Sequence, residues 1–156
     1  AGKVPPPPTE TAVVLTGRAP CGLAAHRGEL WVGVYESGLL LRLDREGRIR
    51  QRVRVGRFAC HVAVAGDAVW VTRDNAGSLV RFDRRSGRRQ SVRVPSPYGV
   101  VRAAGGIWVT GFETGTVSRI DPRTARVTRV YRTGGYPTGI TACAGSVCLL
   151  AQIGIR

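Results

Sequence analysis

The cysteines are the residues of this chain whose type and spacing suggest chemistry most directly. Cys143 and Cys148 bracket the sequence CAGSVC. A two-residue turn at Gly145-Ser146 would place the two cysteines opposite each other at a non-hydrogen-bonded position of a hairpin, where Cα atoms come closest. We therefore predict a Cys143–Cys148 disulfide, with a pair of buried free thiols as the alternative.

Cys21 and Cys60 form the second pair, 39 residues apart. They could face each other across neighbouring strands, and the sequence leaves open whether they are bonded. The four cysteines do not follow a C-x2-C zinc pattern, so no metal site is predicted. Their even number favours an exported protein in an oxidising compartment.

His61 is the residue that could act as a general acid or base. It stands where three equivalent positions carry Gly22, Gly99 and Gly139, and a histidine there could carry a proton near neutral pH. The alternative is a loop histidine that tolerates the turn. Nucleophile-elbow, phosphate-loop and dinucleotide motifs do not occur, so no catalytic residue is predicted.

A sequence repeat supplies the elements that must position these residues. Trp31, Trp70 and Trp108 are spaced by 39 and 38 residues. A glycine and an aspartate keep that spacing in each copy: Gly38, Gly77, Gly115, Asp44, Asp83 and Asp121. Each copy holds four short runs rich in β-formers, separated by turn-forming clusters. This pattern predicts an all-β protein, a β-propeller of four-stranded antiparallel blades with repeats of about 40 residues.

The repeat also divides the chain. Residues 1–11, with the run Pro5–Pro8, are expected to form a proline-rich arm or linker. The predicted blades are the last strand of a preceding blade at 12–17, full blades at 22–56, 61–95 and 99–134, and a partial blade at 139–156. These fifteen strands make just under four blades. Three alternatives follow: a piece of a longer chain, a homodimer that completes the ring, or a closed four-bladed ring with a thin blade. No stretch is apolar enough to span a membrane.

One face of a propeller gathers the loops that enter the first strand and the loops between the second and third strands of each blade. Loops held by a rigid scaffold often carry function. On this face the residues differ between blades while their surroundings repeat. The candidate ligand-binding residues are Cys21, Tyr35, Glu36, Cys60, His61, Arg73, Asp74, Asn75, Tyr98, Phe112, Glu113 and Thr138.

Several blade segments resemble a known family. They are PCGLAA at 20–25, PYGVVR at 97–102, PTGITA at 137–142, WVT at 70–72 and 108–110, and GTVSRIDPRT at 115–124. These segments are similar to bacterial YVTN-type repeats and to virginiamycin B lyase (streptogramin lyase)-like propellers. The resemblance covers almost everything after Thr11 and implies the propeller fold.

The resemblance also implies an enzymatic activity. In the lyase family, a glutamate and histidines converge with a magnesium ion to eliminate across a carbon–oxygen bond. Here Gly111 stands where the acid is expected, and His61 is the histidine on the right face. A magnesium-dependent lyase is therefore an alternative that requires catalytic residues beyond these blades.

The chain is strongly basic, with 24 Lys+Arg against 10 Asp+Glu and a net charge of +14. Only Lys3 is a lysine, which is typical of coding bias in a high-GC genome. Arginines that alternate along an outer strand, and others around the rim, would form a positive stripe: Arg48, Arg50, Arg52, Arg54, Arg88, Arg89, Arg93, Arg126, Arg129 and Arg132. The stripe would discourage edge pairing, or would bind polyanions in a salt-dependent way.

The sequence therefore favours a non-enzymatic binding module that is exported or surface-tethered. Its expected ligand is a protein, a peptide or a glycan, held on the loop face without a cofactor. The lyase-like enzyme and the polyanion binder are the two alternatives.

Overall fold

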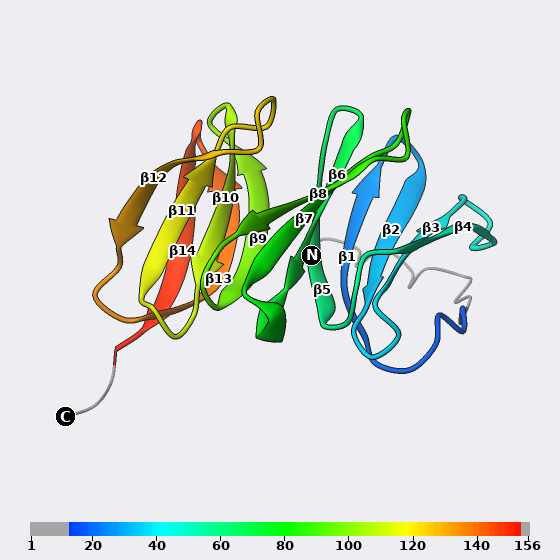
Figure 1. The fold of residues 1–156 in the computed structure, drawn as a ribbon, viewed down its shortest axis with the longest axis horizontal. Coiled ribbons are helices and arrows are strands. Elements are labelled where there is room, and N and C mark those ends of the chain that lie inside the picture. Colours follow the sequence, from blue (N-terminus) through cyan, green and yellow to red (C-terminus); the bar gives the residue numbers. More distant parts are fainter. Residues whose placement is uncertain (1–12, 154–156) are drawn as a thin grey trace, which may run out of the picture.

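The computed structural model describes residues 13–153, which form antiparallel strands and one short 3-10 turn, η1 (Asp74–Ala76). Three sheets have four strands and a fourth has two (Figure 1). The predicted arm at residues 1–11 lies outside the described residues. Within the described residues there is no helix long and apolar enough to cross a membrane.

Each sheet is one propeller blade. Blade 1 contains β1 (Pro20–His26), β2 (Glu29–Val34), β3 (Leu39–Leu43) and β4 (Ile49–Arg54). Blade 2 contains β5 (Ala59–Ala65), β6 (Ala68–Arg73), β7 (Ser78–Asp83) and β8 (Arg89–Arg93). Blade 3 contains β9 (Pro97–Ala103), β10 (Gly106–Gly111), β11 (Thr116–Ile120) and β12 (Val127–Arg132). Blade 4 contains β13 (Tyr136–Cys143) and β14 (Ser146–Gln152).

The strands of each blade pair in chain order, and the first strands of successive blades (β1, β5, β9 and β13) contact one another. This arrangement confirms the predicted propeller architecture. Blade 1 lies at one side of the molecule and blades 3 and 4 at the other (Figure 1). A closed four-bladed ring is therefore wrong for the part of the chain that the structure describes.

The prediction of a strand at residues 12–17 is wrong for its described part, residues 13–17. The described strands number fourteen, not fifteen. A fourth strand must pair with the third strand of its own blade, and the described residues hold no such strand beyond β13 and β14. Val14 packs instead on the outer apolar face of blade 1.

The repeated tryptophans and arginines are cross-strand partners between the second and third strands of a blade. The pairs are Trp31–Arg42, Trp70–Arg81 and Trp108–Arg119. The guanidinium carbon of Arg81 lies 6.0 Å from the centroid of the Trp70 ring. In blades 2 and 3 the arginine lies over the indole of its partner, which is a cation–π contact between the second and third strands.

The repeated aspartates stabilise the turn between the third and fourth strands. Asp83 Oδ1 accepts hydrogen bonds from the backbone of Arg85 and Ser86, and Asp121 Oδ1 accepts from Arg123 and Thr124. The Ser86 backbone and hydroxyl lower the pKa of Asp83. These are Asx turns, which explains why the position repeats.

The hydrophobic core lies between blades. Trp31 and Leu40 of blade 1 pack against Val69, Val71 and other residues of blade 2. On the opposite face of blade 2, Trp70 packs against Ile107 and Val109 of blade 3. Alternate residues of a strand therefore face alternate neighbours, as the period-two pattern predicts.

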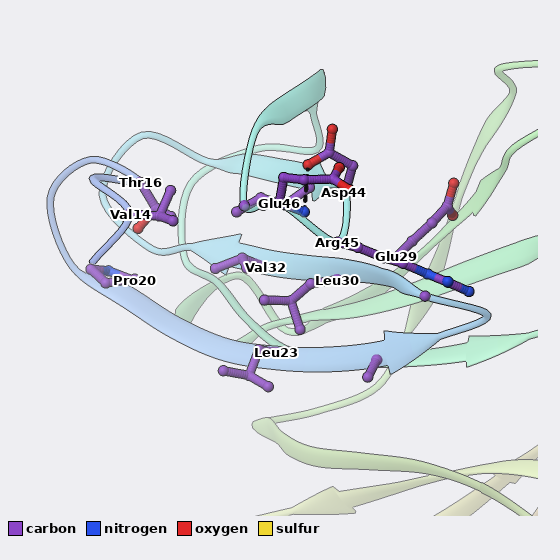
Figure 2. Close-up of a pocket in the computed structure, with 14 residues that line it drawn as sticks. Val14, Thr16, Pro20, Leu23, Glu29, Leu30, Val32, Asp44, Arg45 and Glu46 are labelled. Atoms are coloured by element: carbon purple, nitrogen blue, oxygen red, sulfur yellow. Dashed lines mark hydrogen bonds between the residues drawn. The ribbon is translucent and has the colours of Figure 1, made fainter. Parts of the chain in front are cut away.

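The outer face of blade 1 has no blade packed against it among the described residues. Val32 and Leu43 line a groove of about 920 Å³ there, together with Leu23, which is 66 % exposed. Figure 2 shows Val14 and Thr16 beside this groove and Asp44 and Glu46 along its rim. The groove is the uncovered face of a blade, and it is separate from the candidate loop face.

Candidate functional site

Four aromatic rings form a continuous row on the loop face of blades 2, 3 and 4. The ring centroids of His61 and Tyr98 lie 4.6 Å apart, those of Tyr98 and Phe112 5.7 Å, and those of Phe112 and Tyr136 5.6 Å. We call these four residues the aromatic row. His61 comes from β5, Tyr98 from β9 and Tyr136 from β13, and Phe112 follows β10. The row therefore crosses three blades.

A bulge at the start of each inner strand sets up this face. The register between β5 and β6 shifts between Ala59 and Val62, so His61 lies within the irregularity. The hydroxyl of Thr72, which is buried, accepts the His61 backbone N–H at 3.0 Å. Blade 3 repeats this bond, because Thr110 accepts the Gly99 N–H at 2.8 Å.

His61 is more than a turn residue. Burial lowers the pKa of His61, and a hydrogen bond with the Tyr98 backbone partly offsets this effect. Its Nδ1 atom is buried and has no hydrogen-bond partner among the described residues. The ring therefore presents an unsatisfied polar atom within the aromatic row.

The Cys21–Cys60 disulfide lies beside the row and joins β1 to β5. The structure forms this bond, which the sequence left open, with the Cα atoms 4.7 Å apart. Cys60 is buried, 1 % exposed, whereas Cys21 is exposed. The disulfide therefore links the inner strands of blades 1 and 2 and joins an exposed cysteine to a buried one.

The Asp74 carboxyl lies next to this disulfide. One carboxylate oxygen and both sulfurs lie within 4.8 Å of one another. Burial raises the pKa of Asp74 to about 6, and a hydrogen bond with Thr72 partly offsets the rise. Oδ1 is buried without a partner among the described residues. Asp74 is therefore a carboxyl that keeps its proton up to about pH 6.

Tyr35, Phe58 and Asn75 form a smaller group near blade 1. The Asn75 side-chain amide donates a 2.6 Å hydrogen bond to the Tyr35 hydroxyl. The rings of Tyr35 and Phe58 lie 5.4 Å apart, edge to face. This group extends the aromatic surface with a polar edge.

The remaining candidate residues have other positions. Glu36 makes an exposed ion pair with Arg18 at 3.7 Å. Arg73 Nε donates to the Arg57 carbonyl at 3.2 Å and so braces a loop. Glu113 is exposed, and Thr138 is half-buried in β13. These four do not join the aromatic row.

The sequence prediction missed Phe58 and Tyr136. Both occupy the position just before a blade opening, where the other blades have Ala19 and Ser96. This position varies between blades in the same way as the candidate residues, so it carried a usable signal. The buried threonines of the WVT segments were also missed.

The described residues do not supply the acidic side chain and the magnesium ligands that the lyase resemblance implies. A Cβ on Gly111 would meet the Thr114 and Thr116 hydroxyls and the Pro95 carbonyl, so an acidic side chain has no room. The only cluster of three potential metal ligands in the described residues is Cys21, Cys60 and Asp74. Its two sulfurs are bonded to each other, and magnesium prefers oxygen ligands. These residues do not fit a magnesium ion.

The second disulfide lies in the β13–β14 hairpin. The predicted Cys143–Cys148 pairing is confirmed, with the Cα atoms 5.8 Å apart. The predicted turn is wrong: Cys143 pairs with Ser146, and the turn residues are Ala144 and Gly145, with φ of 38° and 78°. Two positive φ values make a type I′ turn, which matches strand twist better than a turn one residue later.

The arginine stripe on β4 alternates as predicted, with Arg50, Arg52 and Arg54 exposed. Asp44 accepts hydrogen bonds from the guanidinium groups of Arg48 and Arg50, so part of the positive charge is neutralised within the blade. Binding of polyanions stays a prediction.

No family model and no curated protein sequence matches this chain. Solved structures do match its fold. Virginiamycin B lyase from Staphylococcus aureus aligns with a TM-score of 0.74 at 18 % identity, over 88 % of this chain and 50 % of that one. BamB from Moraxella catarrhalis aligns with a TM-score of 0.68 at 20 % identity, over 83 % and 40 %. A streptogramin B lyase structure aligns with a TM-score of 0.55 at 15 % identity, over 85 % and 62 %.

The chain therefore spans about half the length of the first two of these proteins. At identities this low, the structural alignments show a shared fold and nothing about activity. All three are β-propellers, and the chain is an arc of β-propeller blades.

Proposed function

We propose that this chain is a ligand-binding β-propeller module that holds an extended peptide segment across the aromatic row. The observation that carries the proposal is the row itself, in which His61, Tyr98, Phe112 and Tyr136 are packed ring to ring across three blades. Exposed, rigid aromatic side chains offer a large contact area at low entropic cost.

Polar groups beside the row support the proposal. Asn75 and the Tyr35 hydroxyl, which form an exposed hydrogen-bonded pair, offer polar groups to a ligand backbone. Tyr98 and Tyr136 are 36 % and 48 % exposed, so a ligand can reach their rings. A surface with aromatic anchors and a few polar groups is typical of peptide and protein recognition.

Two structurally similar propellers add support. One is described as a Nidogen/Laminin complex and another as BBS1N in complex with ARL6DN. We further propose export to an oxidising compartment, which the two disulfides support.

The proposal can be tested by selecting linear peptides from a random display library on the immobilised chain. We expect the selected peptides to bind Tyr98→Ala about tenfold more weakly than the parent chain or worse, since a central aromatic anchor often contributes more than 1 kcal/mol.

The matched control is Tyr131→Ala. Tyr131 stacks on Trp108 on the outer strand β12, away from the row. Equal loss in the two variants, or selected peptides insensitive to both, would contradict the proposal. A panel of oligosaccharides run in parallel tests the glycan alternative: binding of sugars but of no peptide would also contradict it.

A further inference from the structure

The disulfide and carboxyl at the edge of the candidate face have a chemistry that ligand binding does not use. The Cys21 and Cys60 sulfurs and an Asp74 carboxylate oxygen lie within 4.8 Å of one another. The three residues come from β1, β5 and η1, so the fold of two blades is needed to bring them together.

The two cysteines differ in accessibility. Cys21 is exposed and Cys60 is 1 % exposed. A nucleophile from solvent therefore attacks the Cys21 sulfur, and the Cys60 sulfur is the leaving group. A leaving thiolate formed in a buried position needs a proton or a positive charge to stabilise it.

We propose that Cys21–Cys60 is a thiol–disulfide exchange site at which Asp74 protonates the Cys60 thiolate released when a dithiol reductant attacks Cys21.

The exchange balances as follows. A thiolate of the dithiol forms a bond to Cys21 Sγ while the Cys21–Cys60 bond breaks, and the Asp74 proton moves to Cys60 Sγ. The second thiol of the reductant, deprotonated by solvent, then attacks the reductant sulfur that is bonded to Cys21 Sγ. That mixed disulfide breaks, and the released Cys21 thiolate takes a proton from solvent. The reductant is oxidised to a disulfide, the protein gains two electrons, and solvent returns a proton to Asp74.

The environment of Asp74 suits this role. Burial raises the pKa of Asp74 to about 6, while an ordinary cysteine thiol has a pKa of about 8.5, so proton transfer from the carboxyl to the thiolate is favourable. The carboxyl oxygen Oδ1 has no competing partner among the described residues.

Other titratable and charged groups lie on the elements around Asp74. They are His61 on β5, Arg73 on β6, Arg57 before β5, Tyr98 and Arg102 on β9, and the exposed Arg18–Glu36 pair beside blade 1. None of these charges is a cause of the Asp74 shift, which arises from burial and from hydrogen bonds with Thr72 and its own backbone. The pH dependence is therefore assigned to Asp74.

The chain carries its own control. The Cys143–Cys148 disulfide lies in the β13–β14 hairpin, whose strands contain no acidic residue. A water-soluble trialkylphosphine reduces both disulfides without needing a thiolate. After alkylation, mass spectrometry reports the reduction rate of each pair. The ratio of the two rates cancels the pH dependence of the phosphine itself.

We expect the ratio of the Cys21–Cys60 rate to the Cys143–Cys148 rate to fall about fivefold or more between about pH 5 and about pH 8, as Asp74 ionises. In Asp74→Asn the ratio should be low and independent of pH. Asp74→Glu should restore a pH-dependent ratio, and Asp67→Asn, which removes an acid in the β5–β6 turn of the same blade, should behave like the parent chain.

Two results would overturn the proposal. A ratio that does not change with pH in the parent chain removes the role of the carboxyl. A ratio in Asp74→Asn that is high and independent of pH shows that charge repulsion, and not proton donation, governs the rate. The assay contains no peptide, so its outcome is independent of the peptide-binding proposal.

Discussion

The raised pKa of Asp74, which suits it to donate a proton, also lowers the stability of the folded chain. Its pKa is about 6 in the folded chain against 3.8 as the model-compound value. A raised carboxyl pKa means that the folded state holds its proton more tightly than the unfolded state. The folded chain therefore loses stability as pH rises from about 4 to about 6, and that loss persists at higher pH.

We predict that Asp74→Asn stabilises the chain at pH 7 by on the order of 1 kcal/mol, a value discounted because the carboxyl is only partly buried. At pH 4, where Asp74 is largely protonated, the gain should nearly vanish. Urea unfolding at both pH values measures this. An equal gain at the two pH values would show that ionisation is not the cause.

Thr110 tests how much a buried hydrogen bond beneath the loop face contributes to stability. It is fully buried, and its hydroxyl accepts the Gly99 N–H at 2.8 Å. Thr110→Val leaves that N–H buried and unpaired, which should cost about 1–3 kcal/mol of unfolding free energy. Thr110→Ser keeps the hydroxyl and should cost clearly less. Equal losses in denaturant unfolding would assign the effect to packing instead.

At the residue scale, the sequence could place His61, Tyr98 and Phe112 on one face, because strand order alone decides which loops emerge together. It could not reveal the raised pKa of Asp74. That shift depends on partial burial of the Asp74 carboxyl beside a disulfide whose two cysteines are 39 residues apart. Long-range packing of this kind leaves no local pattern.

At the scale of elements, the packing of one blade on the next depends on the tryptophan side chains between them. Trp70 is fully buried between blades 2 and 3, whereas Trp108 is only half-buried, beside the two-stranded blade 4. We predict that Trp70→Ala lowers the unfolding free energy by about 3–5 kcal/mol and that Trp108→Ala lowers it by markedly less. Denaturant unfolding of the two variants measures the difference. Losses of equal size would contradict the assigned packing.

Elements were predictable where they repeat. Three copies of the tryptophan, glycine and aspartate positions define three four-stranded sheets, because each position serves the same turn or cross-strand pair. Predictions of strands and turns failed where the element depends on pairing with another strand. Residues 13–17 have strand-like composition but no third strand to pair with, and the hairpin turn shifted by one residue to Ala144-Gly145.

At the scale of the molecule, the two end sheets expose apolar side chains. Leu23 on blade 1 is 66 % exposed and Leu150 on blade 4 is 73 % exposed. Such faces in a propeller are normally covered by another blade. When these 156 residues are made on their own, we therefore expect a second copy to cover them, as in the ring-completing homodimer that is one of the three alternatives from the sequence.

Light scattering coupled to size exclusion should then report about twice the 16.7 kDa chain mass. The double variant Leu23→Arg with Leu150→Arg should return the mass to that of one chain. Ser91→Arg, which adds charge to the outer strand β8, is the control and should stay dimeric. A parent chain that remains a monomer at high concentration would contradict this prediction.

The central claim is that the aromatic row binds a peptide, and amide chemical-shift mapping tests it most directly. A selected peptide would be titrated into the ¹⁵N-labelled chain. We predict that the largest shifts fall at His61, Tyr98, Phe112 and Tyr136 and at their immediate neighbours. Shifts confined to the arginine-rich outer strands β4, β8 and β12 would contradict the claim and would favour the charged rim as the binding surface.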